Sequence, residues 1–202
     1  MKLLIAIPAL DFMSTAFVKA LQGLTEQLHR DGVPFEVDIQ TGTLVYFGRD
    51  RLARRAVNEG FTRVLWLDSD MVFAPTIYDE LTFCGAPFVT AVAVSRREPF
   101  ASCIFEKIAP EPVRFDVKQL PREPFEVAGC GLACALTETT ILREVLQAEG
   151  TAFFPTQKFG EDVAFCDRAR RLGHRIVCDP HVRVGHIGHI AVYPDDAERW
   201  KA

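Results

Sequence analysis

Two aspartates end the most strand-like segment of the chain, RVLWLDSDMVF at 63–73. Side chains two residues apart in an extended segment point the same way, so Asp68 and Asp70, which flank Ser69, should present both carboxylates on one face. Carboxylate oxygens are ligands that Mg²⁺ and Mn²⁺ prefer, with coordination positions left for diphosphate oxygens. We therefore predict a divalent-cation site here; the alternative is an Asx-turn that leads into a helix begun by Pro75.

A second acidic pair, Glu161 and Asp162, follows Phe159-Gly160 and opens the helical segment GEDVAFCDRARRLG. A carboxylate at this point could act as a general base that takes the proton from an attacking hydroxyl. Acidic residues in the first turn of a helix are also favoured by the helix dipole alone. The spacing leaves both interpretations open.

Histidines near the carboxyl end of the chain add candidate metal ligands. The string VGHIGH contains His186 and His189, and one of them is expected to return to the ligand-binding edge as a neutral imidazole ligand. A histidine held by hydrogen bonds in a turn is the alternative interpretation. Spacing alone does not choose between the two histidines.

Arginines gather on one predicted helix at 49–59, at positions Arg49, Arg51, Arg54 and Arg55. Near a helix start that faces the ligand edge, guanidinium groups can bind a diphosphate through paired hydrogen bonds. The alternative is a solvated helix face whose arginines pair with nearby acids.

The elements that must position these residues alternate between strand-like and helix-like patterns. Apolar runs predict strands at 2–7, 34–39, 63–67, 86–94 and 125–136, with edge strands or extended segments at 175–180 and 182–186. Helical spacing predicts a helix from the cap Ser14 to Gly32, one from the cap Thr137 to Gly150, and others at 49–59, 75–83 and 161–172. This alternation predicts an α/β fold with a mostly parallel central sheet and helices on both faces. Ligands of such sheets bind beyond the carboxyl ends of the strands, where Asp68 and Asp70 lie.

Residues 95–124 interrupt the alternation and contain five of the twelve prolines. We expect a long loop there that acts as a binding segment or lid, within one domain that spans 1–202. The net charge of −4 argues against nucleic acid as the main partner, because nucleic-acid binding needs a basic surface. The six scattered cysteines indicate buried thiols rather than disulfides or a zinc site.

The first apolar run ends at Pro8 and is too short for a signal peptide, and no segment approaches the ~20 apolar residues that span a bilayer. We therefore expect a cytoplasmic protein without a membrane span.

The order of the motifs is more specific than any one of them: IAIPAL, GRDRLARRAV, VLWLDSDMVF, VAGCGLAC, FGEDVAFCDRARRLGHRI and VGHIG. From about Leu3 to His189 this order resembles the GT-A glycosyltransferases, in particular small family 2-like members from bacteria and phages. The resemblance implies a Rossmann-like GT-A fold and a metal-dependent glycosyltransferase that uses Mn²⁺ or Mg²⁺. Its donor would be a UDP- or GDP-linked sugar, with a hexose as the expected sugar, and its acceptor a hydroxyl group.

The resemblance also implies roles for the acidic residues. Asp68 and Asp70, with Ser69 between them, match the D-x-D motif that binds the metal and the donor diphosphate. His186 matches a histidine that completes the metal site. Asp162, which follows Glu161, matches the catalytic base of inverting members.

Nucleotide contacts are implied in the same way. Pro8, Ala9 and Asp11 lie where the first strand meets the nucleobase. Arg49 matches the arginine of a common Arg-Asn pair, whose asparagine is replaced here by Asp50.

Two other functions compete with this one. A sugar-phosphate nucleotidyltransferase would carry a glycine-rich basic loop after the first strand, but the sequence there is PALDFMS, with no glycine before Gly23. A non-catalytic nucleotide- or glycan-binding module would lack a metal aspartate or the base, and both are present. The sequence leaves open the donor base, the sugar, the acceptor, inversion against retention, and the oligomeric state, homo-oligomers included.

Overall fold

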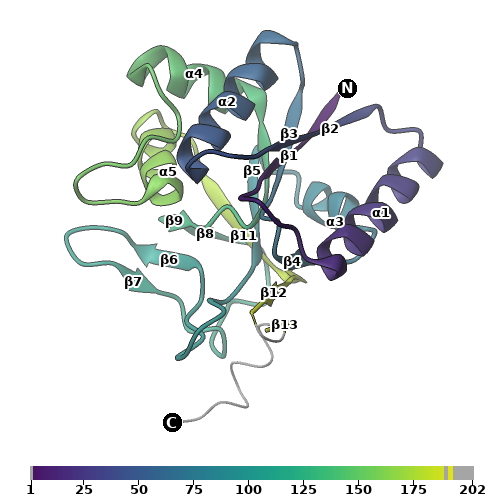
Figure 1. The fold of residues 1–202 in the computed structure, drawn as a ribbon. Helices are drawn as coiled ribbons and strands as arrows, with labels where there is room; N and C mark the ends of the chain where they lie inside the picture. Colours follow the sequence, from purple (N-terminus) through teal and green to yellow (C-terminus); the bar gives the residue numbers. More distant parts are fainter. Residues whose placement is uncertain (1, 189–190, 193–202) are drawn as a thin grey trace.

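The computed structural model describes residues 2–188 and 191–192. Within these residues, seven strands form the central sheet (Figure 1), in the order β2 (Phe35–Gln40), β1 (Leu3–Pro8), β3 (Arg63–Leu67), β10 (Cys134–Glu138), β5 (Phe88–Val92), β11 (Ile176–Arg183) and β8 (Phe125–Val127). Strand β1 runs parallel to β2 and β3, and β11 runs parallel to β5. Strand β10 is antiparallel to both β3 and β5, and β8 is antiparallel to β11. The predicted α/β fold with a mostly parallel sheet is confirmed.

Helices cover both faces of this sheet (Figure 1), as the apolar strands require. Helices α1 (Thr15–Arg30) and α3 (Ile77–Phe83) lie on one face, and α2 (Val45–Asn58), α4 (Thr139–Glu149) and α5 (Glu161–Arg171) lie on the other. Alternate residues of β1 enter the two cores: Leu3 and Ile5 pack in the cluster that contains α1, and Leu4 packs in the cluster that contains α2. A strand buried on both faces reads as a continuous apolar run, which is why LLIAI has no polar residue.

The helix ends agree with the sequence at some points and differ at others. Ser14 caps α1, with its Oγ accepting a hydrogen bond from the Phe17 amide at 3.0 Å, and Gly150 ends α4 with φ 72°, as predicted. The predicted cap Thr137 is wrong: Glu138 is the residue before α4, and Thr137 belongs to β10. Its buried hydroxyl accepts a hydrogen bond from the Trp66 indole at 3.0 Å instead.

Helix α2 begins at Val45, four residues before the predicted start at 49. Leu44 precedes it and makes no side-chain capping bond, so the usual sequence signal of a helix start is missing. Arg49 therefore lies in the second turn of α2 rather than at its first residue.

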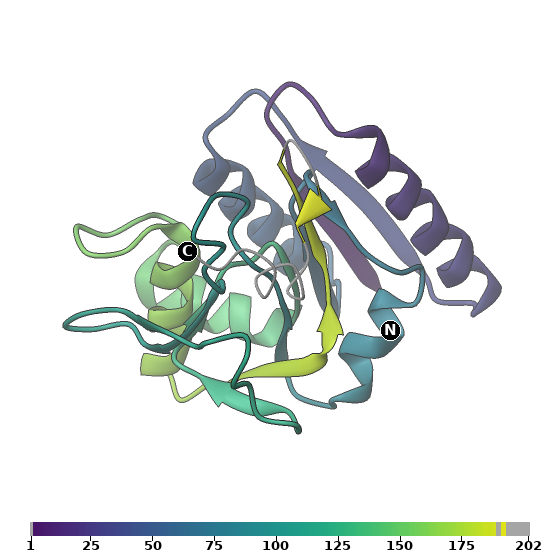
Figure 2. The ribbon, with the colours of Figure 1, turned by 90° about the horizontal axis from the view of Figure 1, so that it is seen from below.

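The segment 95–124 is not one long loop. It contains β6 (Ile104–Lys107) and β7 (Val113–Arg114), which form an antiparallel sheet with β9 (Gly129–Cys130) in the order β7-β6-β9. The predicted strand at 125–136 is accordingly divided into β8, β9 and β10, because β9 pairs with β6 and leaves the central sheet. The β6–β7 hairpin and the segment that leads into α5 extend from the same side of the molecule in both views (Figure 1, Figure 2).

Strand β11 is also not an edge strand, since it lies between β5 and β8. After it, β12 (Gly185–Ile187) pairs with β4 (Met71–Val72) and with β13 (Ala191–Val192) in a small second sheet. This pairing sets His186 opposite Met71. Strand β12 is thereby brought close to the carboxyl end of β3.

All six cysteines are free. Four of them, Cys130, Cys134, Cys166 and Cys178, are buried as expected, and Cys84 and Cys103 are partly buried. Within the described part of the chain, no helix combines the length and the apolar character needed to cross a membrane.

Candidate functional site

A cavity of about 490 Å³ opens beyond the carboxyl ends of β1 and β3. Nine of the ten residues predicted to act in the site line it: Pro8, Ala9, Arg49, Asp68, Ser69, Asp70, Glu161, Asp162 and His186. The tenth, Asp11, is exposed on the loop after β1 and lies outside the cavity. Residues that are far apart in the sequence therefore meet at the edge where a ligand of an α/β sheet is expected.

Arg49 lies beneath this cavity with 2% of its side chain exposed. Its Nη2 donates a hydrogen bond to Asp68 Oδ1 at 2.6 Å, and its Nη1 donates to Glu161 Oε1 at 3.0 Å. The same Nη1 lies 3.8 Å from Asp162 Oδ2. Burial alone would lower the pKa of Arg49, but the charges of the three carboxylates outweigh it and raise the pKa. Arg49 thus joins Asp68, which follows β3, to the two acids that begin α5.

The three carboxylates share one guanidinium, so the cluster has an excess of negative charge. Burial raises the pKa of Asp68 even though Arg49 opposes the shift. Burial also raises the pKa of Glu161, and the charge of the neighbouring Asp162 raises it further. A site that holds carboxylates with raised pKa values around a cavity is suited to receive positive charge or a proton.

Asp50 anchors the segment that directly follows α4, a role that the sequence did not reveal. Its side chain is 7% exposed, and Oδ1 accepts hydrogen bonds from the Thr151 hydroxyl at 2.8 Å and the Ala152 amide at 2.7 Å. Its Oδ2 accepts from Arg54 Nε at 2.9 Å. Asp50 therefore anchors the segment 151–153 that leads to Glu161, and the only signal for it in the sequence was its place beside Arg49.

A second polar group is formed by Asp70, His186 and Arg96. The His186 Nδ1 lies 2.9 Å from the carbonyl oxygen of Val94, and because a carbonyl can only accept, Nδ1 carries a hydrogen. The other ring nitrogen, Nε2, faces Asp70 Oδ2 at 3.3 Å. The backbone holds this arrangement, since the Ile187 amide donates to the Asp70 carbonyl at 2.7 Å.

The pKa values of this pair move in opposite directions. Burial alone would raise the pKa of Asp70, but the contacts with His186 and Arg96 lower it overall. Burial alone would lower the pKa of His186, but the hydrogen bonds to Asp70 and to the Val94 carbonyl raise it overall. Each group thus favours the charged form of the other.

Arg96 is a charged residue of this site that no motif in the sequence indicated. Its Nη1 donates to Asp70 Oδ2 at 2.5 Å, and 48% of its side chain is exposed at the cavity. The sequence contains it only as part of SRREP, in a segment interpreted as a loop.

The predicted metal ligands are brought together in part. Asp70 Oδ2 and His186 Nε2 face each other, and the bond from Nδ1 to a carbonyl leaves Nε2 as the nitrogen for a ligand, as in many metal-binding histidines. In Asp68, by contrast, Oδ1 accepts a hydrogen bond from Arg49. Among the described residues, no three His, Cys, Asp or Glu side chains already form a metal-binding group. His189 lies outside the described residues. The side chains of Asp70 and His186 are therefore suited to bind a cation, and in Asp68 only Oδ2 is not bound by Arg49.

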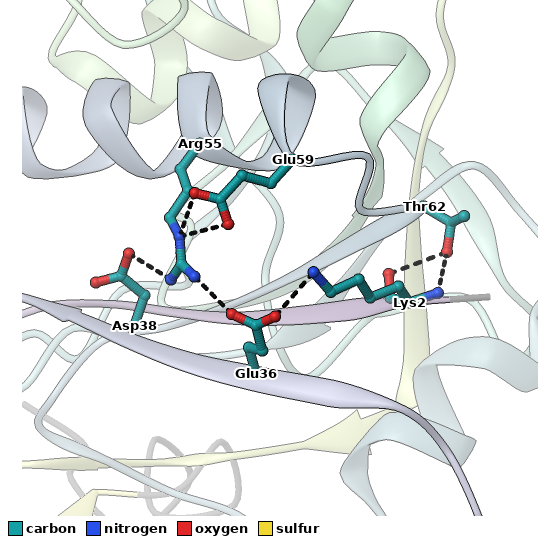
Figure 3. A network of polar contacts seen from close by, with 6 residues as sticks. All are labelled: Lys2, Glu36, Asp38, Arg55, Glu59 and Thr62. Carbon is teal, nitrogen blue, oxygen red and sulfur yellow. Dashed lines mark hydrogen bonds and ion pairs between the residues drawn. The ribbon is translucent and has the colours of Figure 1, made fainter.

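The other arginines of α2 lie away from the cavity. Arg55 donates to Glu36, Asp38 and Glu59 at the surface between α2 and β2 (Figure 3). Arg54 pairs with Asp50, and Arg51 is exposed. For Arg54 and Arg55 the alternative of a helix face paired with acids is the correct one.

No protein-family model matches the sequence, and no curated protein matches it either. Solved structures do match its fold. A197 from STIV is 19% identical, with a TM-score of 0.67 over 96% of this chain and 91% of that chain. The catalytic domain of Drosophila β1,4-galactosyltransferase 7, in complex with xylobiose, is 14% identical, with a TM-score of 0.51 over 90% of this chain and 66% of that chain.

A UDP-glucose pyrophosphorylase in complex with UDP-glucose is 10% identical, with a TM-score of 0.51 over 95% of this chain and 90% of that chain. At these identities the likeness concerns the fold alone. The central sheet, its covering helices and these matches show that the chain has a GT-A-like (Rossmann-like) α/β fold.

Proposed function

We propose that this protein is a metal-dependent glycosyltransferase that moves a sugar, with a hexose as the expected case, from a UDP- or GDP-linked donor to a hydroxyl acceptor. One observation carries the proposal: a single cavity at the carboxyl edge of a GT-A-like sheet contains both the Asp68–Asp70 pair and the Glu161–Asp162 pair. The first pair suits a cation and a diphosphate, and the second suits proton transfer. The cavity volume of about 490 Å³ is within the usual range for small-ligand sites.

The nucleoside would lie at the end of the cavity formed by the loop after β1. Pro8, Ala9 and Leu10 line this end together with Leu44. Leu10 and Leu44 are 69% and 58% exposed, so their apolar surfaces are free to contact a base. Burial of such surface stabilises a complex by roughly 25 cal/mol per Å².

Asp70 and His186 would hold Mn²⁺ or Mg²⁺, and Asp68 would contribute the oxygen that Arg49 does not bind. A cation bound there would neutralise charge on the departing diphosphate, which is Lewis-acid catalysis. Ser69, between the two aspartates, lies on the cavity wall and can contact the diphosphate.

Asp162 would act as the general base. It would take the proton of the acceptor hydroxyl while that oxygen bonds to the anomeric carbon and the bond from this carbon to the diphosphate oxygen breaks. A Cβ at Gly131 would lie 3.5 Å from Asp162 Oδ2, so Gly131 packs directly beside this oxygen. Arg49, at 3.8 Å, holds the carboxylate in place without a close hydrogen bond, and Glu161 shares the Arg49 guanidinium.

A nucleotidyltransferase remains the main alternative, because a UDP-glucose pyrophosphorylase shares the fold. The loop between β1 and α1, residues 9–14, contains no Lys or Arg to bind a triphosphate, which favours the glycosyltransferase. The two reactions release different products. A nucleoside diphosphate formed from a nucleotide-sugar identifies a transferase, and pyrophosphate formed from a nucleoside triphosphate and a sugar phosphate identifies a nucleotidyltransferase.

The first test is thermal unfolding with UDP, GDP, CDP and ADP, each with Mn²⁺ and with EDTA. A ligand at a hundred times its Kd adds about 2.7 kcal/mol to the free energy of unfolding. We expect one diphosphate to stabilise the protein with Mn²⁺ and not with EDTA, and D70N to lose that effect. The matched control D79N removes an exposed carboxylate on α3 and should keep it. Absence of stabilisation by all four diphosphates, with or without Mn²⁺, would contradict the proposal and favour a binding module for another ligand.

A further inference from the structure

The balance of charge around the cavity makes Arg96 unusual. Four carboxylates line it, from Asp68, Asp70, Glu161 and Asp162, against two guanidinium groups, from Arg49 and Arg96. Arg49 is 2% exposed and surrounded by acids, whereas Arg96 is 48% exposed. Among the described residues that line the cavity, Arg96 is therefore the one arginine that a bound diphosphate could reach.

Arg96 is held by the same atom that the proposed cation would use. Its Nη1 donates to Asp70 Oδ2, and this oxygen also faces His186 Nε2 at 3.3 Å. A divalent cation between Asp70 and His186 would take this oxygen and repel the guanidinium, because both carry positive charge. The cation and Arg96 therefore compete for Asp70.

The backbone around Arg96 allows the side chain to move while its base stays in place. The loop is closed by a hydrogen bond from the Ser95 amide to the Ala101 carbonyl at 2.8 Å. The Val94 carbonyl, two residues before Arg96, accepts the bond from His186 Nδ1. The start of the loop is thus attached to the proposed metal ligand, whereas the Arg96 side chain is 48% exposed and is held by its contact with Asp70.

We propose that Arg96 is a diphosphate-binding residue that pairs with Asp70 when no cation is bound and turns to the donor diphosphate when a cation occupies Asp70 and His186. This inference rests on the proposed function and adds a residue to its donor site. It makes the diphosphate contact conditional on the cation, since the acidic cavity offers a free guanidinium only after the cation has displaced it. Paired hydrogen bonds from a guanidinium to phosphate oxygens are among the stronger polar contacts in proteins.

Removal of the guanidinium should have opposite effects on the two ligands. In R96Q, Mn²⁺ alone should bind about two- to fivefold more tightly, because a partly exposed ion pair no longer competes for Asp70. UDP or GDP at saturating Mn²⁺ should bind about tenfold more weakly, because a charge-assisted hydrogen bond is lost. R96K, which keeps the charge without the paired donors, should fall between the wild type and R96Q for both ligands.

The experiment measures Mn²⁺ binding by electron paramagnetic resonance without nucleotide, and UDP and GDP binding by calorimetry at saturating Mn²⁺. The control R97Q removes the neighbouring arginine, which is exposed and does not line the cavity, and should behave as the wild type. This inference alone would be overturned if R96Q bound the nucleoside diphosphate as tightly as the wild type does. It would also be overturned if R96Q bound Mn²⁺ as tightly as the wild type, or more weakly. Failure of the wild-type protein to bind either diphosphate would overturn the proposed function as well.

Discussion

Helix α2 carries two arginines, six positions apart, that each bind three carboxylates. Arg49 contacts Asp68, Glu161 and Asp162 at the cavity. Arg55 contacts Glu36, Asp38 and Glu59 at the surface between α2 and β2 (Figure 3). The composition of the two clusters is nearly the same, and their environments differ.

Arg55 is 28% exposed, and its Nε, Nη1 and Nη2 each donate to a carboxylate. Lys2 supplies a second cation to Glu36 at 2.8 Å. Arg49 is 2% exposed, and its buried Nε has no hydrogen-bond partner. The members of the surface cluster therefore pair with one another, whereas the Arg49 cluster has more carboxylates than guanidinium groups at the wall of a cavity. The two clusters contain the same residue types. Burial of the arginine and an adjacent cavity therefore distinguish the Arg49 cluster as a candidate site.

The largest expected difference between the clusters concerns catalysis. D162N should lower kcat about 10²- to 10⁴-fold, the usual contribution of a general base, while the affinity for the nucleoside diphosphate changes little. E59Q removes one carboxylate from the Arg55 cluster and should leave kcat unchanged. The measurement is the release of nucleoside diphosphate from the donor in the presence of an acceptor. A D162N enzyme as active as E59Q would show that Asp162 is not the base.

Stability should distinguish the two arginines next. R49M leaves three carboxylates around a buried uncharged side chain and should lower the free energy of unfolding by about 3 to 5 kcal/mol. R55M breaks exposed ion pairs and should cost about 1 kcal/mol. Urea unfolding of both variants measures the difference. If R49M does not fold, R49K, which keeps the charge, should fold with an intermediate loss, and equal costs for the two arginines would contradict the comparison.

Salt should reduce the stability that the Arg55 cluster provides and leave that of the Arg49 cluster nearly unchanged. At 1 M salt the screening length falls to about 3 Å, against about 10 Å at 0.1 M. The cost of R55M should therefore shrink toward zero in 1 M NaCl, whereas the cost of R49M should remain, because its partners meet a guanidinium that solvent hardly reaches. Urea unfolding of the wild type and the two variants at both salt concentrations tests this. Loss of the R49M effect in salt would mean that the cavity cluster is as solvated as the surface cluster.

The smallest effect is the pH dependence of the metal-free protein. The pKa of His186 is raised above its ordinary 6.5, so the stability that protonated His186 provides is fully present below pH 6.5 and is lost as the pH rises through the raised value. The difference in unfolding free energy between the wild type and H186Q, measured in EDTA, should therefore shrink from pH 6 to pH 9.

In the surface cluster, the pH dependence of stability has the opposite sign. The hydrogen bond from Lys2 lowers the pKa of Glu36 below its ordinary 4.5, burial opposes the shift, and Arg55 lowers the pKa further. The stability that Glu36 provides is present above pH 4.5 and is lost as the pH falls. E36Q should therefore approach the wild type in acid, and a difference that instead grew below pH 4.5 would contradict the sign.

Much of the fold followed from local patterns. The apolar runs of β1, β3 and β5 predicted buried strands because a strand covered on both faces has no polar side. Ser14 predicted the start of α1 because its hydroxyl satisfies a free amide of the first turn. Asp68 and Asp70 were found because any polar pair at the carboxyl end of such a strand lies where ligands bind.

The remaining features depended on which segments pair with one another. The apolar pattern of 125–136 indicated burial but not that β9 would leave the sheet to join β6, nor that β10 would enter it antiparallel between β3 and β5. The hairpin within 95–124 could not be predicted from the sequence because its strands are short and flanked by prolines. Thr137 has the sequence pattern of a helix cap, and the polar partner of its hydroxyl, Trp66, lies 71 residues away, beyond the reach of any local pattern.

The sequence by itself determined the α/β class, the buried strands and the acids at their ends, because these follow from periodicity and residue type within a few positions. Only the tertiary structure decided that Arg49 lies beneath the cavity and Arg55 at the surface. It also decided that Asp50 anchors the segment after α4 and that Arg96 and His186 meet at Asp70. Burial, ion pairing and competition for one carboxylate oxygen depend on groups up to 116 residues apart, and no local pattern reports such contacts.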